Sequence, residues 1–199
     1  AQSFLDSMQA EGRSGADIGI MNPGGIRAEL YYAAGDSMGD ADGVITFREA
    51  ANIMPFNNIV ETKDLTGAQF IALLEQQWQP EGSSRPFLKL GLSENVTYTY
   101  DPDAPAGQRI TTVMVDGALI DEAATYTIAS SSFLMAGGDN FTVLAEGSNA
   151  KDTGLIDQSL FVEWIGQQSP LSPVFVKHAV AVSDQPTAAT AGEQVSFTA

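Results

Sequence analysis

Three short loop sequences carry most of the residues in this chain that could bind a ligand. They occupy residues 22–27, 55–58 and 133–139. Together they supply two phenylalanine rings, an arginine, two candidate amides and a carboxylate, beside glycines that allow close backbone approach. Aromatic rings can stack on a flat heterocycle, amides can read its edge, and a guanidinium can bind an anion. These loops predict a site for a nucleoside and an attached anionic group.

Few residues are available for metal chemistry. The chain has no cysteine and one histidine, His178. Hydrolytic metal sites are usually built from clustered histidines and carboxylates. We therefore predict no catalytic residue, no cofactor and no metal site in this chain, which would make it a substrate-binding module that is inactive alone. His178 is assigned no role, because a lone histidine of this kind is far more often structural or solvent-facing.

The decapeptide that starts at Asp40 resembles the second half of a calcium-binding EF-hand loop. Asp40, Asp42 and Glu49 stand at fitting positions, but Met38 occupies the place of the first ligand. Thr46 and Glu49 also match a capping box, the pattern that starts a helix. We favour a turn followed by this helix start over a calcium site.

Composition bounds the class of protein. The chain has 199 residues, 44% of them hydrophobic, and a net charge of −16. This length can bury the core of one soluble globular domain, and no apolar stretch is long enough to span a membrane. The negative charge would repel polyphosphate, so we expect no nucleic-acid partner, and any bound anion must meet local arginines. The lack of cysteine does not fix the redox compartment.

Hydrophobic periodicity and capping signals predict a single compact α+β domain. Helices are expected at residues 1–12, from Thr46 to before Pro55, from Thr66 through Trp78, and from an N-cap at Asp157 through Ile165. Strands are expected at 17–21, 59–62, 96–100, 110–115, 118–120 and 126–129, with an extended segment at 174–176. A hairpin turn is expected at Asp116-Gly117.

The end of the chain differs in character. Residues 183–192 are rich in proline, threonine, alanine and glycine, which predicts a linker. Residues 193–198 look like the opening strand of a further β-domain. We therefore divide the chain into a domain at 1–182 and, at 183–199, a linker with the start of a truncated β-domain. Residues 1–12 do not read as a signal peptide, and the chain looks excised from a longer protein.

Short motifs follow one another in a set order along the chain, at residues 15–18, 22–27, 55–58, 65–67, 91–92, 98–101 and 133–139. In this order they resemble the C-terminal domain of the 5'-nucleotidase family over roughly residues 1–180. The resemblance implies a mixed α/β domain of that type. It also implies a partner, an N-terminal metallophosphoesterase domain with two divalent metal ions, which is missing from this chain. The whole enzyme would be extracellular, cell-wall-attached or periplasmic, and would hydrolyse nucleotide phosphate esters.

The resemblance also implies roles for individual residues. Phe56 and Phe133 would stack on the base, Arg27 would meet phosphate, and Asp139 would accept hydrogen bonds from the ribose hydroxyls. Each has a structural alternative, which is a core ring for the phenylalanines, a surface ion pair for the arginine and a turn for the aspartate. The complete set of predicted substrate-binding residues is Asn22, Gly25, Arg27, Phe56, Asn58, Gly91, Phe133 and Asp139.

The same predicted binding residues would also suit other functions. The domain could be an accessory module of a cyclic-nucleotide phosphodiesterase, a nucleotide-sugar hydrolase or an extracellular nuclease. It could also be a non-enzymatic nucleoside-binding surface domain. The sequence upstream of residue 1 would separate these alternatives, because an enzyme must supply clustered metal ligands there.

Overall fold

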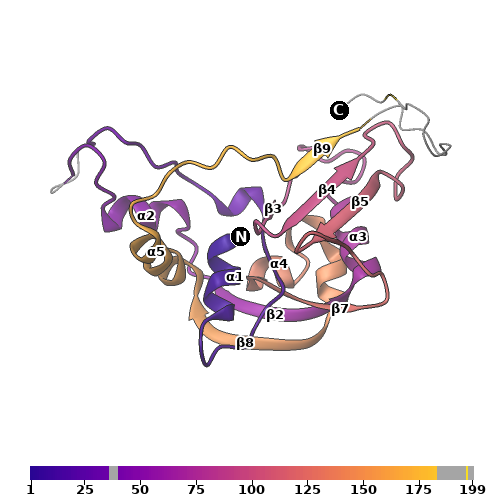
Figure 1. Cartoon of the computed structure of the whole chain (residues 1–199), viewed down its shortest axis with the longest axis horizontal. Coiled ribbons are helices and arrows are strands. Elements are labelled where there is room, and N and C mark those ends of the chain that lie inside the picture. The colour runs from indigo at the N-terminus through magenta and orange to yellow at the C-terminus, as the bar shows by residue number, and fades with distance from the viewer. Residues whose placement is uncertain (36–39, 183–195, 197–199) are drawn as a thin grey trace.

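Two mixed β-sheets form the framework of the domain (Figure 1). The computed structural model describes residues 1–35, 40–182 and 196. The five-stranded sheet has the order β3-β1-β7-β2-β8, and the four-stranded sheet has the order β6-β5-β4-β9. The strands are β1 (Ile18–Met21), β2 (Ile59–Thr66), β3 (Gly91–Leu92), β4 (Val96–Tyr100), β5 (Ile110–Val115), β6 (Ala118–Leu119), β7 (Thr125–Ser131), β8 (Ser148–Ile156) and β9 (Ala179–Ala181). The predicted mixed α/β class is confirmed.

Helices cover both faces of the five-stranded sheet. They are α1 (Gln2–Gln9), α2 (Phe47–Ile53), α3 (Gly67–Glu75), α4 (Ser132–Met135) and α5 (Asp157–Gln168), with 3-10 turns η1 (Pro23–Gly25), η2 (Gly138–Asn140) and η3 (Thr142–Glu146). Ile128 packs into a core shared with α3, α4 and the four-stranded sheet, whereas Ala129 packs into a second core with α1 and α5. Successive strand residues face opposite sides, so this sheet lies between the two cores.

Strand pairing explains why the three loops can meet. β1 and β7 are parallel, with Ile18 opposite Ile128, so their carboxyl ends lie at the same edge of the sheet. β2 is antiparallel to β7, with Val60 opposite Ser131, so its amino end lies at that edge too. The loop after β1, the loop before β2 and the turn after β7 are therefore neighbours, although they are far apart in the sequence.

Both predicted capping boxes are present. At α2, the backbone N–H of Thr46 donates to Glu49 Oε2 over 2.8 Å, and this bond with a second one from the Thr46 hydroxyl lowers the pKa of Glu49. The Glu49 carboxylate thus caps the start of α2, as the capping-box pattern predicts. Met38 lies outside the described residues, and within the described ones no group of three His, Cys, Asp or Glu could hold a metal ion.

The capping box at α3 gives a direct test of helix stability. Thr66 Oγ1 accepts from the Gln69 N–H over 3.1 Å, and Gln69 Oε1 accepts from the Thr66 N–H over 2.9 Å. Thr66→Ala removes the acceptor and is expected to lower the free energy of unfolding by about 1 kcal/mol. Urea denaturation measures this loss. Thr66→Ser keeps the hydroxyl and should stay within a few tenths of a kcal/mol of the wild type; an equal loss in both variants would contradict the role of the cap.

Several expectations need correction. Helix α3 ends at Glu75, so Trp78 lies beyond it, where its ring makes an edge contact with Phe87 at 5.0 Å. Asp157 is the first residue of α5 and not its N-cap. Strand β2 runs on to Thr66, and β8 was not predicted.

The last part of the chain gives mixed results. Residues 174–176 belong to no strand and are exposed, and the chain enters a strand only at β9. Nδ1 of His178 lies 3.2 Å from the Val96 carbonyl oxygen, beside β4. The predicted linker and β-domain start at 183–199 lie outside the described residues, apart from Ser196. No helix in the described ranges is long and apolar enough to cross a bilayer.

Candidate functional site

A cavity of about 320 Å³ opens at the sheet edge where the three loops meet. We call it the main cavity; its lining residues are Met21, Asn22, Gly24, Gly25, Arg27, Phe56, Asn58, Arg85, Ser131, Phe133 and Asp139. The structure thus brings together all the predicted site residues except Gly91. That glycine lies on β3 beside the backbone of Met21 and lines a neighbouring cavity of about 360 Å³, which shares Met21 and Asn22 with the main cavity.

The two aromatic side chains are half exposed. Phe56 is 51% exposed and Phe133 is 47% exposed, so neither is a core residue. Phe56 lies in the loop before β2, and Phe133 lies on α4 directly after β7. The Phe133 ring occupies the space above Gly138, where the Cβ of any other residue would come within 2.6 Å of the ring. Both rings line the main cavity, where a flat ligand can reach them.

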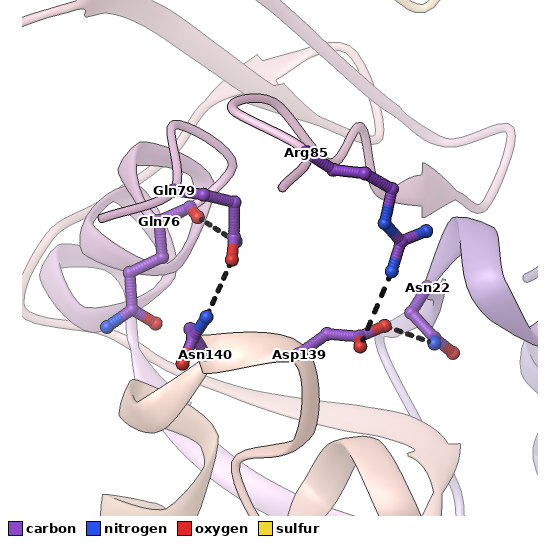
Figure 2. Close-up of polar contacts among 6 residues, drawn as sticks. All are labelled: Asn22, Gln76, Gln79, Arg85, Asp139 and Asn140. Carbon is purple, nitrogen blue, oxygen red and sulfur yellow. Dashed lines mark hydrogen bonds and ion pairs between the residues drawn. The ribbon is translucent and has the colours of Figure 1, made fainter. Parts of the chain in front are cut away.

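A hydrogen-bonded pair forms one wall of the main cavity. Asn22 is only 4% exposed, and its Nδ2 donates to Asp139 Oδ2 over 2.7 Å (Figure 2). Nη2 of Arg85 lies 3.8 Å from the other carboxylate oxygen, Oδ1. The backbone of Asp139 is left-handed, with φ of 54°, and Gly137, two residues earlier, has φ of 89°. The tight turn therefore aims the carboxylate at the cavity, where an amide and a guanidinium stabilise it.

Arg27 lies over one of the aromatic rings. Its guanidinium carbon is 5.0 Å from the centroid of the Phe56 ring, a cation–π contact, and its backbone N–H donates to the Ile53 carbonyl over 2.9 Å. Within residues 1–35 and 40–182 the guanidinium forms no ion pair, in contrast to the surface-pair alternative. Gly25, two residues before Arg27, leaves room for the Met21 side chain, whose Cε would lie 2.2 Å from an added Cβ.

The amide of Asn58 is fixed by a buried carboxylate. Its Nδ2 donates to Asp157 Oδ2 over 3.0 Å, and the Asp157 N–H donates to the Asn58 carbonyl over 2.9 Å. Asp157 is 1% exposed, and its other oxygen accepts from the Gln158 N–H. A carboxylate can only accept here, so the amide nitrogen must face it. Since no donor in the described ranges reaches Oδ1 of Asn58, this oxygen is available to a ligand in the main cavity.

Replacing the buried carboxylate tests this orientation. Asp157→Asn has the same shape but can present either end of its amide, so Asn58 loses its fixed orientation. We expect the free energy of unfolding to fall by about 1–2 kcal/mol, and the affinity for a ligand that donates to Asn58 to fall several-fold. Urea denaturation and calorimetric titration measure the two effects. Asp103→Asn, on an exposed loop, is the control and should change neither; an unchanged Asp157→Asn variant would contradict the proposed orientation.

Sequence reasoning missed four lining residues, of which Arg85 matters most. It lies in the loop between α3 and β3, and its side chain is 55% exposed. No motif includes it. The only signal was charge, because each of the nine cationic side chains in a chain of net charge −16 is a candidate partner for an anion. Of the other three, Gly24 lies within the 22–27 motif although it was not assigned a role, Met21 ends the predicted strand before that motif, and Ser131 lies between the predicted strand 126–129 and the 133–139 motif.

The protein is a mixed α/β domain in which three loops build a cavity at one edge of the five-stranded sheet. The sequence model of the family described as "5'-nucleotidase, C-terminal domain" matches residues 1–146. The chain therefore belongs to the 5'-nucleotidase C-terminal domain family.

Similar proteins support this assignment. The chain is 34% identical over 168 residues to the trifunctional nucleotide phosphoesterase protein YfkN of Bacillus subtilis (strain 168), covering 80% of this chain and 11% of that protein. It is 33% identical over 161 residues to protein UshA of Salmonella pullorum, covering 80% and 26%. The crystal structure of a 5'-nucleotidase precursor from Thermus thermophilus matches with a TM-score of 0.72 and 28% identity, covering 93% and 35%. The chain spans about a third or less of these relatives.

Proposed function

We propose that this chain is the nucleoside-binding domain of an exported 5'-nucleotidase-type phosphoric monoester hydrolase. The observation that supports this most is the main cavity, in which two half-exposed phenylalanine rings and a supported carboxylate line one space. The family membership supports the hydrolase class. The catalytic partner would be an N-terminal metallophosphoesterase domain, and the whole enzyme would work outside the cytoplasm, at the cell wall or in the periplasm.

In this proposal the base lies between Phe56 and Phe133. Stacking on each ring would contribute on the order of 1–3 kcal/mol and would tolerate any base, because every base has a π-face. The free Oδ1 of Asn58 would accept a hydrogen bond from an amino or imino group on the base edge. Stacking would thus supply the affinity, and Asn58 would favour bases whose edge carries an N–H donor.

The ribose and phosphate would lie along the polar wall. Asp139 would accept from the ribose hydroxyls, as its carboxylate is supported by Asn22 and Arg85. Arg27 would bind the phosphate with its planar fork. A local cation is necessary here, because the protein as a whole carries a net charge of −16 and repels anions.

Catalysis would be divided between domains. Two divalent metal ions on the N-terminal domain would supply an activated water and stabilise the charge on phosphorus. This domain would hold the nucleoside and present the phosphate to them, so that binding energy on the base serves positioning. The isolated chain is therefore expected to bind nucleosides without releasing phosphate from AMP.

Calorimetric titration with adenosine and AMP tests the proposal. The chain is expected to bind adenosine, and Phe56→Ala should weaken binding by about tenfold or more, since one stacking face is lost. Phe47→Ala is a matched control, because Phe47 is a 70% exposed phenylalanine on α2 that does not line the main cavity. Absence of adenosine binding, or equal affinities in the two variants, would show that the main cavity is not a nucleoside site.

A further inference from the structure

A lysine on the central sheet supports the turn that carries Asp139. Lys63 lies on β2 opposite Ile128 of β7, so both side chains face the core that contains residues of α4. Lys63 is only partly exposed, and it forms no ion pair within residues 1–35 and 40–182. A charged side chain in such a position needs hydrogen-bond partners from the protein.

The Lys63 ammonium joins the two ends of this turn. Its Nζ donates to the carbonyl of Met135 over 2.8 Å and to the carbonyl of Leu144 over 3.2 Å. Met135 is the last residue of α4 and Leu144 lies in η3, and both are fully buried. We call residues 136–143 the Asp139 turn. Because one ammonium binds the residue on either side of it, both ends of the Asp139 turn are fixed relative to β2.

The backbone of the Asp139 turn needs such support. Gly137, Asp139 and Asn140 are all left-handed, with φ of 89°, 54° and 64°. Residues other than glycine rarely adopt this conformation, and it persists where the surrounding structure holds it in place. The position of the Asp139 carboxylate therefore depends on the side chains that anchor the turn, in addition to its direct partner Asn22.

A second anchor acts on the other half of the turn. Gln79, in the loop after α3, accepts at Oε1 from Nδ2 of Asn140 over 2.8 Å (Figure 2). This contact holds the second half of the turn. Lys63 acts on the first half, because it reaches Met135, which directly precedes the turn. Without the lysine the turn should stay attached at Asn140, while its first half shifts and moves Asp139.

We propose that Lys63 is a positioning residue for nucleoside binding, which sets the place of the Asp139 carboxylate in the main cavity without touching the ligand. This inference rests on the proposed function, in which Asp139 accepts from the ribose hydroxyls. The residues that line the main cavity do not include Lys63, so its effect must pass through the Asp139 turn. Binding contacts need supporting side chains that hold them within about 0.5 Å. Loss of Lys63 therefore weakens the ribose contact and leaves stacking on Phe56 in place.

Calorimetric titration with adenosine and 2',3'-dideoxyadenosine tests the inference. The two ligands differ only in the ribose hydroxyls, so the ratio of their dissociation constants reports the contact with Asp139. The wild type is expected to bind adenosine about tenfold more tightly. In Lys63→Met this preference should fall to about threefold or less. In Lys63→Gln, whose amide can still donate to one carbonyl, it should lie between the two. A general change in stability or stacking affects both ligands and cancels in the ratio.

Lys151→Met is the matched control, because Lys151 is an exposed lysine on β8, the neighbouring strand of the same sheet. Its preference for adenosine should equal that of the wild type. If Lys63→Met keeps the wild-type preference, the inference is wrong and the proposed function stands. If Lys63→Met does not fold, an unchanged preference in Lys63→Gln leads to the same conclusion.

The wild-type titrations separate this inference from the proposed function. If adenosine binds but is not preferred over 2',3'-dideoxyadenosine, Asp139 does not hold the ribose. The role of Lys63 is then wrong, while the main cavity remains a nucleoside site. If adenosine does not bind, the proposed function fails and this inference fails with it.

Discussion

Gly138→Ala is expected to reduce adenosine binding by at least about tenfold and to lower the free energy of unfolding by about 1–3 kcal/mol. The added Cβ would lie 2.6 Å from two ring atoms of Phe133 and 2.7 Å from its carbonyl oxygen. Both distances are too short for carbon contacts, so the ring and the turn must move. The turn also carries Asp139, so one methyl group would displace two proposed ligand contacts. Urea denaturation and calorimetric titration measure the effects.

A double-mutant cycle separates the ring contact from backbone strain. In a Phe133→Ala background the ring is gone and only the contact with the carbonyl oxygen remains. The stability loss caused by Gly138→Ala should then shrink by about 0.5 kcal/mol or more, which is the signature of residues in direct contact. Additive losses would mean that the ring does not need the space above Gly138, and would count against the geometry of this wall.

The positions of the three loops could be predicted only in part from the sequence. Glycines, prolines and capping signals identify where the elements end, because these signals act within a few residues. That the loops meet depends on the parallel pairing of β1 with β7 and the antiparallel pairing of β2 with β7. No local pattern encodes those pairings. Only the family resemblance could therefore predict that the three loops meet.

Strand β8 was not predicted from the sequence for a different reason. Six of its first seven residues are exposed, and it lies at the edge of the five-stranded sheet. It therefore lacks the alternation of apolar and polar residues that reveals a half-buried strand. Its pairing with β2 also shifts register twice, after Ile59 and after Thr62. Such a strand is held by backbone hydrogen bonds to its neighbour, which the sequence does not display.

Arg85 and Asp157 were missed as partners of site residues for a related reason. Arg85 reaches the Asp139 carboxylate and Asp157 reaches the Asn58 amide across 54 and 99 positions of the chain. The same motif of an amide that donates to a carboxylate recurs in the Asn22–Asp139 pair. Asn22 follows β1, and Asp139 lies in the turn after β7, which neighbours β1 in the sheet. Asn58 precedes β2, and Asp157 begins the helix after β8, which neighbours β2 in the sheet. These pairs explain why both asparagines are held in one orientation.

Gly67→Ala is expected to destabilise the whole domain, by about 3 kcal/mol or more. The first turn of α3 packs directly on the loop before β7, where the N–H groups of Gly67 and Ala68 donate to the carbonyls of Ala124 and Glu122 over 3.0 Å each. An added Cβ would lie 2.2 Å from the carbonyl oxygen of Asp121, which is backbone and cannot rotate away. Relief of the clash would break both hydrogen bonds and shift α3, whose Phe70 is fully buried in the core.

Gly166→Ala is the matched control for this change. Gly166 lies within α5, and an added Cβ would meet nothing within 4 Å. Alanine is the better helix former, so this variant should gain about 0.5–1 kcal/mol. The two substitutions are chemically identical, and both add a methyl group to a helix. If urea denaturation shows that they change the free energy of unfolding in opposite directions, the difference comes from the contact with Asp121. If Gly67→Ala were as stable as the wild type, the close docking of α3 on this loop would be wrong.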